Sequence, residues 1–126
     1  MVGATIVADP TTVHREAELA WSGVTGRISY LGPVRGPARP GDLVGAGRLV
    51  LPGLVNAHTH AGMSLLRGYS NEEPLHRWLE RVRAFEVRMT RADIRAGLRL
   101  SLVEMIRSGT VAFADMYLWD AGLLAD

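Results

Sequence analysis

Cysteine and lysine are both absent from this sequence of 126 residues. Without cysteine the chain can form no disulfide, no thiolate metal site and no cysteine nucleophile. It also lacks any run of about eighteen apolar residues, the length that a membrane-spanning helix needs, so no membrane partner is expected. The first ten residues, MVGATIVADP, have neither the charged start nor the long apolar centre of a secretory signal. We therefore expect a cytoplasmic protein.

Charge of neither sign dominates, because 14 basic and 13 acidic side chains leave a formal net charge of +1. All the basic residues are arginine, and they are scattered along the chain rather than gathered in a stripe. This distribution argues against nucleic acid and against an anionic membrane surface as binding partners. The hydrophobic share of 48% and the charged share of 21% are ordinary for a globular domain.

The first fifty residues carry short β-prone segments separated by glycine and proline. These segments are 4–8, 16–21, 27–31, 43–44 and 49–51. Residues 32–41 contain three glycines and three prolines and are predicted to form a surface loop. Several short strands at this spacing indicate part of a small β-sandwich or barrel. Residues 1–50 are too few to bury a sizeable core alone.

The pattern changes after residue 53 to that of an α/β fold. Residues 54–60 begin with apolar side chains and end in a polar tip, as a strand of a buried parallel sheet does. Residues 61–74 are predicted to form a loop with some helical character near its centre. A helix is expected next, with Pro74 in its first turn.

A long helix is the clearest prediction in the sequence. Thr90 and Asp93 form the pattern of a capping box, and apolar side chains then recur at helical spacing. Gly109 is the expected stop, because glycine takes the left-handed conformation without strain. A second buried strand is predicted in residues 110–116, and residues 118–126 are expected to lead into a further helix.

Residues 54–126 thus predict a strand, a loop, helices and a second strand, which together form a βαβ unit with parallel strands. Two parallel strands make no stable sheet on their own, because both faces and both edges need cover. We therefore expect the chain to be a fragment of a larger α/β fold, or one half of a fold that another chain completes.

Two histidines, His58 and His60, stand at the end of the first predicted buried strand. Side chains at positions i and i+2 of a strand point to the same face with Cα atoms about 6.6 Å apart, so both imidazoles can reach one cation at about 2.1 Å. The carboxyl end of a strand is also where α/β barrels place their active sites. The alternative is two exposed histidines without a ligand. His14 and His76 are better explained as solvated side chains.

Four other polar or aromatic residues are candidates for the site, and each also has an ordinary structural explanation. Asp115 ends the second predicted strand, where it either bonds local backbone amides, the interpretation we favour, or supports a metal ligand. Arg67 either contacts an anionic substrate group or caps a turn. Trp78 is most simply a core residue of a helix face, and Glu86 is most simply a solvated charge.

The segment from Leu51 to His60, LPGLVNAHTH, resembles the metal-dependent amidohydrolase superfamily. Its continuation narrows the resemblance to the branch that contains methylthioadenosine/S-adenosylhomocysteine deaminases and the related triazine hydrolases. The matching segments are AGMSLLRGY at 61–69, PL at 74–75, WL at 78–79, EMIRSGT at 104–110 and FADMY at 113–117. The resemblance covers residues 43–120 well and is looser before them.

This resemblance implies a (β/α)8 barrel of the TIM type together with a small β-sandwich. Residues 1–50 would form part of the sandwich, and residues 51–126 would form about two of the barrel's eight units. His58 and His60 would be the first two ligands of a single Zn²⁺, or of iron as in some relatives.

The resemblance also implies two residues that contact the substrate. Trp78 matches a tryptophan that packs against the substrate in the family. Glu86 matches, with a shift of one residue, the glutamate that holds the ribose hydroxyls in nucleoside deaminases. The other metal ligands and the acid–base residues of the family lie on later strands, so no catalytic residue is expected within these 126 residues.

The activity that the resemblance implies is hydrolytic deamination of an adenosine-type or aminopurine-like substrate by a metal-activated water. The ligand would be a small molecule, either a nucleoside or an aminated heterocycle, and relatives in this branch are often homo-oligomers. The alternative among enzymes is a triazine-type chlorohydrolase or a guanine or pterin deaminase. The alternative of another class is a non-catalytic remnant that binds metal or a partner chain. We expect the 126-residue chain alone to be inactive.

Overall fold

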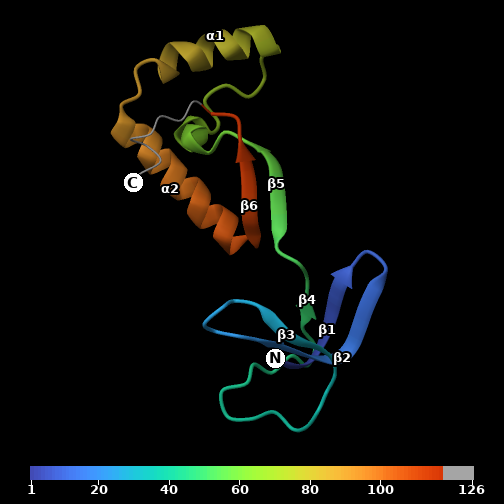
Figure 1. Cartoon of the computed structure of the whole chain (residues 1–126). Helices are drawn as coiled ribbons and strands as arrows, with labels where there is room; N and C mark the ends of the chain where they lie inside the picture. The colour runs from blue at the N-terminus through green and yellow to red at the C-terminus, as the bar shows by residue number, and fades with distance from the viewer. Residues whose placement is uncertain (118–126) are drawn as a thin grey trace. The chain divides into compact units, whose positions relative to one another are not determined.

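The computed structural model describes residues 1–117, so the helix expected in residues 118–126 lies outside the described part. The chain divides into two compact units, Met1–Pro52 and Gly53–Asp126 (Figure 1). The first unit is built from strands, and the second combines a parallel strand pair with helices, which confirms the predicted α/β class. Within residues 1–117, no helix has both the length and the apolar character needed to cross a membrane.

The first unit contains one four-stranded sheet. Its strands are β1 (Val2–Asp9), β2 (Thr12–Trp21), β3 (Ile28–Pro33) and β4 (Leu49–Val50). They lie side by side in the order β3-β2-β1-β4, and only β4 runs parallel to its neighbour β1. The short strands predicted in this region are confirmed at four places, and their membership of a sandwich stays a prediction.

A β-bulge explains why the sequence of β2 alternates irregularly. Between the pairs Ala4–Ala17 and Ile6–His14, β1 advances by two residues while β2 advances by three. Glu16 lies in this stretch with a φ of 47°, in the left-handed region that non-glycine residues seldom adopt. A bulge accommodates the extra residue and increases the local twist of the strand.

The strand predicted at residues 43–44 is wrong as a separate element. In the described chain, Val44 makes a single parallel bridge to Val2 of β1, and β4 pairs further along the same edge. Gly45 approaches β1 so closely that a Cβ at this position would lie 2.7 Å from the Ala4 Cβ. This approach and the turn after it separate the bridge at Val44 from the pairing of β4.

The buried core of the first unit is small. Its buried members are Ala4, Ile6 and Ala17, which lie on the two central strands of the sheet. Met1, Leu19, Leu31 and Val50 pack against them while partly buried. Other apolar side chains of the unit are exposed, and Val24 is 97% accessible. The burial agrees with the expectation that this segment cannot form a sizeable core alone.

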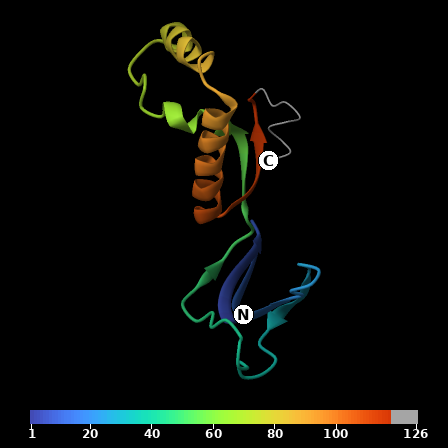
Figure 2. The same cartoon turned by 90° about the vertical axis from the view of Figure 1, so that its left-hand side faces the viewer.

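The second unit has the predicted order of strand, helices and strand. Its elements are β5 (Leu54–Thr59), the 3₁₀ helix η1 (Ala61–Leu66), α1 (Leu75–Glu86), α2 (Arg91–Arg107) and β6 (Thr110–Asp115). β5 and β6 pair in parallel, so the predicted βαβ unit is confirmed. Helix α2 packs against β6 and η1, and both views show it beside the strand pair (Figures 1 and 2).

Helix α2 begins and ends as its sequence predicts. The Asp93 amide donates to the Thr90 hydroxyl at 3.3 Å, and the Thr90 amide donates to the Asp93 carboxylate at 2.8 Å, which completes the capping box. The hydrogen bond that the Thr90 hydroxyl donates to the Asp93 carboxylate at 2.7 Å, and then the bond from the Thr90 amide, also hold the pKa of Asp93 below its ordinary value. Gly109 follows the helix with a φ of 85°, a conformation that glycine adopts at little cost.

Two buried glycines allow η1 and α2 to approach each other closely. A Cβ at Gly97, in the middle of α2, would lie 2.4 Å from the carbonyl oxygen of Gly62 in η1. A Cβ at Gly62 would lie 3.0 Å from a side-chain carbon of Ile94. The backbone that follows β5 is therefore packed directly on the surface of α2.

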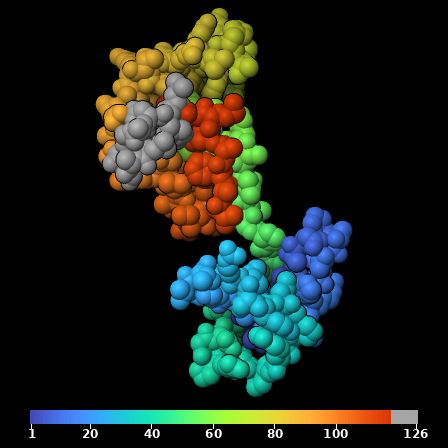
Figure 3. All heavy atoms as spheres, viewed as in Figure 1, coloured from blue at the N-terminus to red at the C-terminus, as the bar shows by residue number. Residues whose placement is uncertain are grey.

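Apolar side chains of the strand pair are open to solvent in the described chain. Val55 and Val111 are 69% and 74% accessible, and Met116, directly after β6, is 65% accessible. The space-filling view shows β6 at the surface of its unit (Figure 3). Parallel sheets are normally covered on both faces, so this pair has apolar area available for further packing.

We predict that Gly97→Ala lowers the free energy of unfolding of the whole protein by about 1–3 kcal/mol. At an exposed helix position the same change would stabilise the helix by about 1 kcal/mol, but here the new methyl group meets the Gly62 carbonyl. Denaturant titration followed by circular dichroism measures the difference. Arg99→Ala, at an exposed position of the same helix, is the control. Unchanged or higher stability in Gly97→Ala would contradict the close approach.

Candidate active site

Polar side chains gather where β5 and β6 end. Because the strands are parallel, their carboxyl ends meet at one edge, where Thr59 lies opposite Asp115. The Met116 amide donates to the Thr59 carbonyl at 3.0 Å and ties the two strand ends together. His58 and His60 flank Thr59, so the structure brings the two predicted metal ligands to the same edge as Asp115.

The imidazole rings of His58 and His60 lie side by side. Their centroids are 5.1 Å apart and their planes are inclined at 80°, as expected for positions i and i+2 at a strand end. Both side chains are exposed. Among residues 1–117, no hydrogen bond or ion pair engages either ring, so their nitrogens are accessible to a ligand.

This donor pair fits the beginning of a metal site. Neutral imidazole is a ligand for zinc and for iron, and a catalytic zinc ion takes about three protein ligands and a water. Among the described residues, no group of three His, Cys, Asp or Glu side chains is placed to hold a metal ion. The described chain thus offers two of the donors that such a site needs.

Asp115 bonds two backbone amides. The bond from Tyr117 is local and agrees with the favoured interpretation of this residue, whereas the bond from Ala61 comes from a residue 54 positions away in the sequence. Its Oδ2 accepts a hydrogen bond from the Ala61 amide at 3.0 Å, and its Oδ1 accepts one from the Tyr117 amide at 3.0 Å. The first bond joins the end of β6 to the residue that follows His60. Asp115 therefore connects the two strand ends beside the histidine pair.

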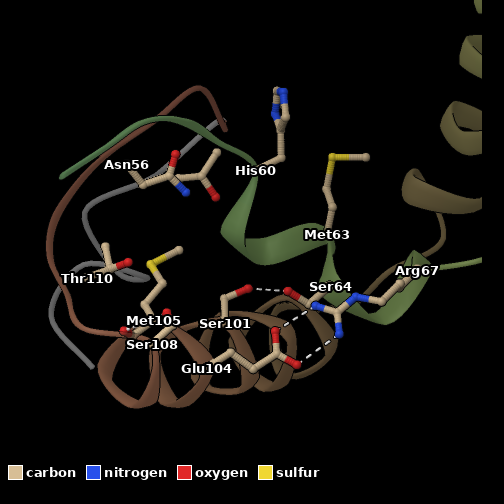
Figure 4. A pocket seen from close by; sticks show the side chains of 11 residues that line it. Asn56, His60, Met63, Ser64, Arg67, Ser101, Glu104, Met105, Ser108 and Thr110 are labelled. Carbon is tan, nitrogen blue, oxygen red and sulfur yellow. Dashed lines mark hydrogen bonds and ion pairs between the residues drawn. The ribbon is translucent and has the colours of Figure 1, made fainter. Parts of the chain in front are cut away.

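Two serine hydroxyls hold the other side of Ala61. Ser101, buried on α2, donates to the Ala61 carbonyl at 2.9 Å, and Ser64 of η1 donates to it at 3.0 Å. The two hydroxyls also contact each other (Figure 4). Neither serine is predicted from the sequence as a residue of the site. The spacing of Gly97 and Ser101, two small residues four positions apart on one helix face, is the pattern that could have indicated Ser101.

Arg67 is engaged by a carboxylate. Its guanidinium donates two hydrogen bonds to Glu104 on α2, at 2.8 and 2.7 Å (Figure 4). The pair lowers the pKa of Glu104 and raises the pKa of Arg67. The first interpretation of Arg67 is a contact with an anionic substrate group. In the structure the Glu104 carboxylate takes that place on the guanidinium. The turn-capping interpretation is confirmed, because the Arg67 amide donates to the Ser64 carbonyl at 3.2 Å.

Two cavities adjoin His60. The larger, of about 500 Å³, lies between η1 and α2 and contains the serine pair and the Arg67–Glu104 pair (Figure 4). The smaller, of about 240 Å³, is mainly apolar, and Trp78 and Val82 of α1 line it together with His60. Trp78 is half-buried. The structure therefore places Trp78 and one predicted metal ligand around the same cavity.

Glu86 ends helix α1 and faces Tyr117, two residues after the end of β6. The Tyr117 hydroxyl hydrogen-bonds to the half-buried Glu86 carboxylate. Burial, then the hydrogen bond and charge of Glu86, and last the charge of Asp115, raise the pKa of Tyr117 to about 12. The interpretation of Glu86 as a freely solvated charge is therefore wrong.

The strand pair and its histidines lie within a segment that matches a known family. Residues 49–125 match the Amidohydrolase family, and this range includes β5, β6 and both helices. The chain belongs to the amidohydrolase family, as its resemblance in sequence predicts.

Relatives within the family include nucleoside deaminases. The chain is 49% identical over 111 residues to a 5-methylthioadenosine/S-adenosylhomocysteine deaminase of Haloquadratum walsbyi, over 81% of this chain and 25% of the relative. It is 45% identical over 125 residues to a protein of the same name from Moorella thermoacetica, over 92% of this chain and 29% of the relative. A 5'-deoxyadenosine deaminase of Methanococcoides burtonii is 56% identical over 72 residues, over 56% of this chain and 17% of the relative. The chain spans less than a third of the length of each.

We predict that Glu86→Gln lowers the pKa of Tyr117 from about 12 toward, but not to, its ordinary value of 10. The substitution removes the negative charge beside the hydroxyl, whereas the burial remains. The folded-state pKa of Tyr117 lies above the unfolded value of 10, so the protonated hydroxyl stabilises the folded state. This contribution to the free energy of unfolding is present below pH 10 and is lost as the pH rises through about 12. The tyrosinate absorbance is followed as the pH is raised, for the unchanged protein and for Glu86→Gln, each with and without Tyr117→Phe. The difference within each pair gives the pKa of Tyr117. Circular dichroism confirms that the fold persists over the titration, and an unchanged pKa would contradict the contact.

Proposed function

We propose that the whole protein hydrolytically deaminates an adenosine-type nucleoside. The observation that carries this proposal is the pair His58 and His60, two accessible imidazoles at a strand end in a chain of the amidohydrolase family. The names of the relatives, deaminases of 5-methylthioadenosine, S-adenosylhomocysteine and 5'-deoxyadenosine, support this class of substrate.

In this proposal His58 and His60 hold zinc, or iron, through their accessible ring nitrogens. When bound, such a metal supplies water of lowered pKa for hydrolysis near neutral pH. Trp78 gives the substrate an apolar wall in the cavity next to His60. Glu86 accepts hydrogen bonds from the ribose hydroxyls, because a carboxylate that already accepts from Tyr117 still has free lone pairs. No acid–base residue is assigned within this chain.

The same proposal includes the architecture of the whole protein. Residues 1–50 would contribute to a β-sandwich, and residues 51–126 would form about two of the eight units of a (β/α)8 barrel. The parallel pair β5–β6 with α2 packed on it supports the barrel assignment. A cytoplasmic homo-oligomer is proposed on the resemblance alone.

The main test uses the whole protein, expressed from its complete reading frame. We predict that it binds zinc or iron and releases ammonia from 5-methylthioadenosine. His58→Ala and His60→Ala should lose the metal and lower kcat/KM by about a hundredfold or more, because metal-ion catalysis contributes several kcal/mol. His76→Ala, at an exposed position of α1, is the matched control and should retain both properties. Metal analysis and an ammonia-release assay give the two readouts.

Each other outcome contradicts the proposal in a different way. Turnover of chlorinated triazines, guanine or pterins without turnover of adenosine-type nucleosides would replace the substrate class. Absence of any turnover, with retained metal or partner binding, would favour the non-catalytic remnant. The isolated 126-residue chain should show no turnover, because its residues 1–117 offer two of the metal's ligands and no group of three.

A second prediction tests Glu86. Glu86→Gln should raise KM for 5-methylthioadenosine about tenfold or more, because a hydrogen bond to a charged group contributes about 1.5–3 kcal/mol. The analogue without the 2′ and 3′ hydroxyls should show no such increase, since it lacks the donors that Glu86 would bind. Steady-state kinetics of the unchanged protein and of Glu86→Gln, each with 5-methylthioadenosine and with the analogue, give the four KM values needed for this comparison. An equal effect on the two substrates would exclude Glu86 as the ribose ligand.

A further inference from the structure

We infer that Asp115 and Ser101 are positioning residues for His60, which they orient by holding the two peptide groups of Ala61. This inference rests on the proposed function, in which His60 binds the metal. We refer to the three side chains that bond Ala61, namely Asp115, Ser101 and Ser64, as the Ala61 clamp.

The amide side of the clamp acts on the peptide group next to His60. The Ala61 amide belongs to the peptide that joins it to His60, and it donates to Asp115 Oδ2 at 3.0 Å. His60 has φ −130° and ψ 66°, where the chain turns from β5 into η1. The ψ angle relates this peptide plane to the Cα–Cβ bond of His60, so a fixed plane restricts the direction of the Cα–Cβ bond that carries the imidazole. Asp115 is itself oriented, because its other oxygen accepts from the Tyr117 amide at 3.0 Å.

The carbonyl side of the clamp connects the same residue to α2. Ser101 is 7% accessible and donates to the Ala61 carbonyl at 2.9 Å, and Ser64 donates to it at 3.0 Å. The close approach at Gly97 brings α2 near enough for the Ser101 bond. The His60 side chain points away from the serine pair (Figure 4). The hydroxyls therefore act on His60 through the backbone rather than by contact with its ring.

His60 needs such support because the usual devices are missing around it in the described chain. β5 ends at Thr59, so the strand ladder does not hold His60. Metal-binding histidines are commonly oriented by a hydrogen bond to their second ring nitrogen, and among residues 1–117 the ring of His60 has no such partner. The clamp supplies the orientation from the backbone side.

The test measures zinc affinity in the whole protein by competition with a coloured chelator. Ser101→Ala and Asp115→Ala should raise the Kd for zinc about tenfold, the lower end of what outer partners of metal ligands contribute. Asp115→Asn should raise it less, because the amide oxygen still accepts one of the two hydrogen bonds. The visible spectrum of the cobalt-substituted protein should shift in the same order, since it reports ligand geometry. Ser108→Ala, at the C-cap of α2, is the control, because its hydroxyl bonds the Met105 carbonyl at 3.1 Å and, within residues 1–117, does not bond Ala61.

The outcomes separate this inference from the proposed function. If His60→Ala leaves the Kd for zinc unchanged, the proposed function fails. If His60→Ala weakens binding while Ser101→Ala and Asp115→Ala lower only the Tm measured with chelator present, the clamp is merely structural and the inference fails alone. Ser64→Ala removes a half-buried hydroxyl from the same carbonyl. If Ser101→Ala or Asp115→Ala fails to fold, Ser64→Ala replaces it in the comparison of the Kd for zinc with the Tm. The expected increase in Kd is smaller for Ser64→Ala.

Discussion

Strands β5 and β6 pair in parallel with Thr59 opposite Asp115, and this register decides which side chains meet at the strand ends. A shift of one residue would turn each side chain of one strand to the other face of the sheet. Asp115 would then no longer reach the Ala61 amide, and the bond from Met116 to Thr59 would be lost. The relative positions of the two histidines, Asp115 and the beginning of η1 therefore follow from one strand pairing between segments more than fifty residues apart.

Shape contributes more than surface charge to the packing of η1 on α2. The Arg67–Glu104 pair is exposed, with side-chain accessibilities of 63% and 46%, and solvent screening leaves such pairs little effect on stability. The absence of a side chain at Gly97 has a larger effect, because an added methyl would force the backbone apart at a cost of about 1–3 kcal/mol. The small residues of α2 therefore determine how closely the backbone after His60 can approach the helix. The ion pair has little effect on that approach.

Features that depend on neighbouring residues could be predicted from the sequence, and features that depend on distant contacts could not. The capping box of Thr90 and Asp93 and the pairing of His58 with His60 follow from local spacing, and the structure contains both. The bulge at Glu16 depends on how two strands align, which no periodicity indicates. The bond from Ser101 to Ala61 joins residues forty positions apart. This bond forms only when α2 and η1 are packed together.

The structural role of Glu86 and its proposed role in binding the substrate are compatible on physical grounds. The pKa of Tyr117 is raised to about 12, so its hydroxyl stays protonated near neutral pH and remains a donor that orients the carboxylate. A half-buried carboxylate without donors would be destabilising, and Tyr117 supplies one when no substrate is bound. Ribose hydroxyls bring further donors of the same kind, and an ionised carboxylate has about four lone-pair sites to receive them. Tyr117 would thus keep Glu86 in place before the substrate arrives, and binding would add hydrogen bonds without first breaking one.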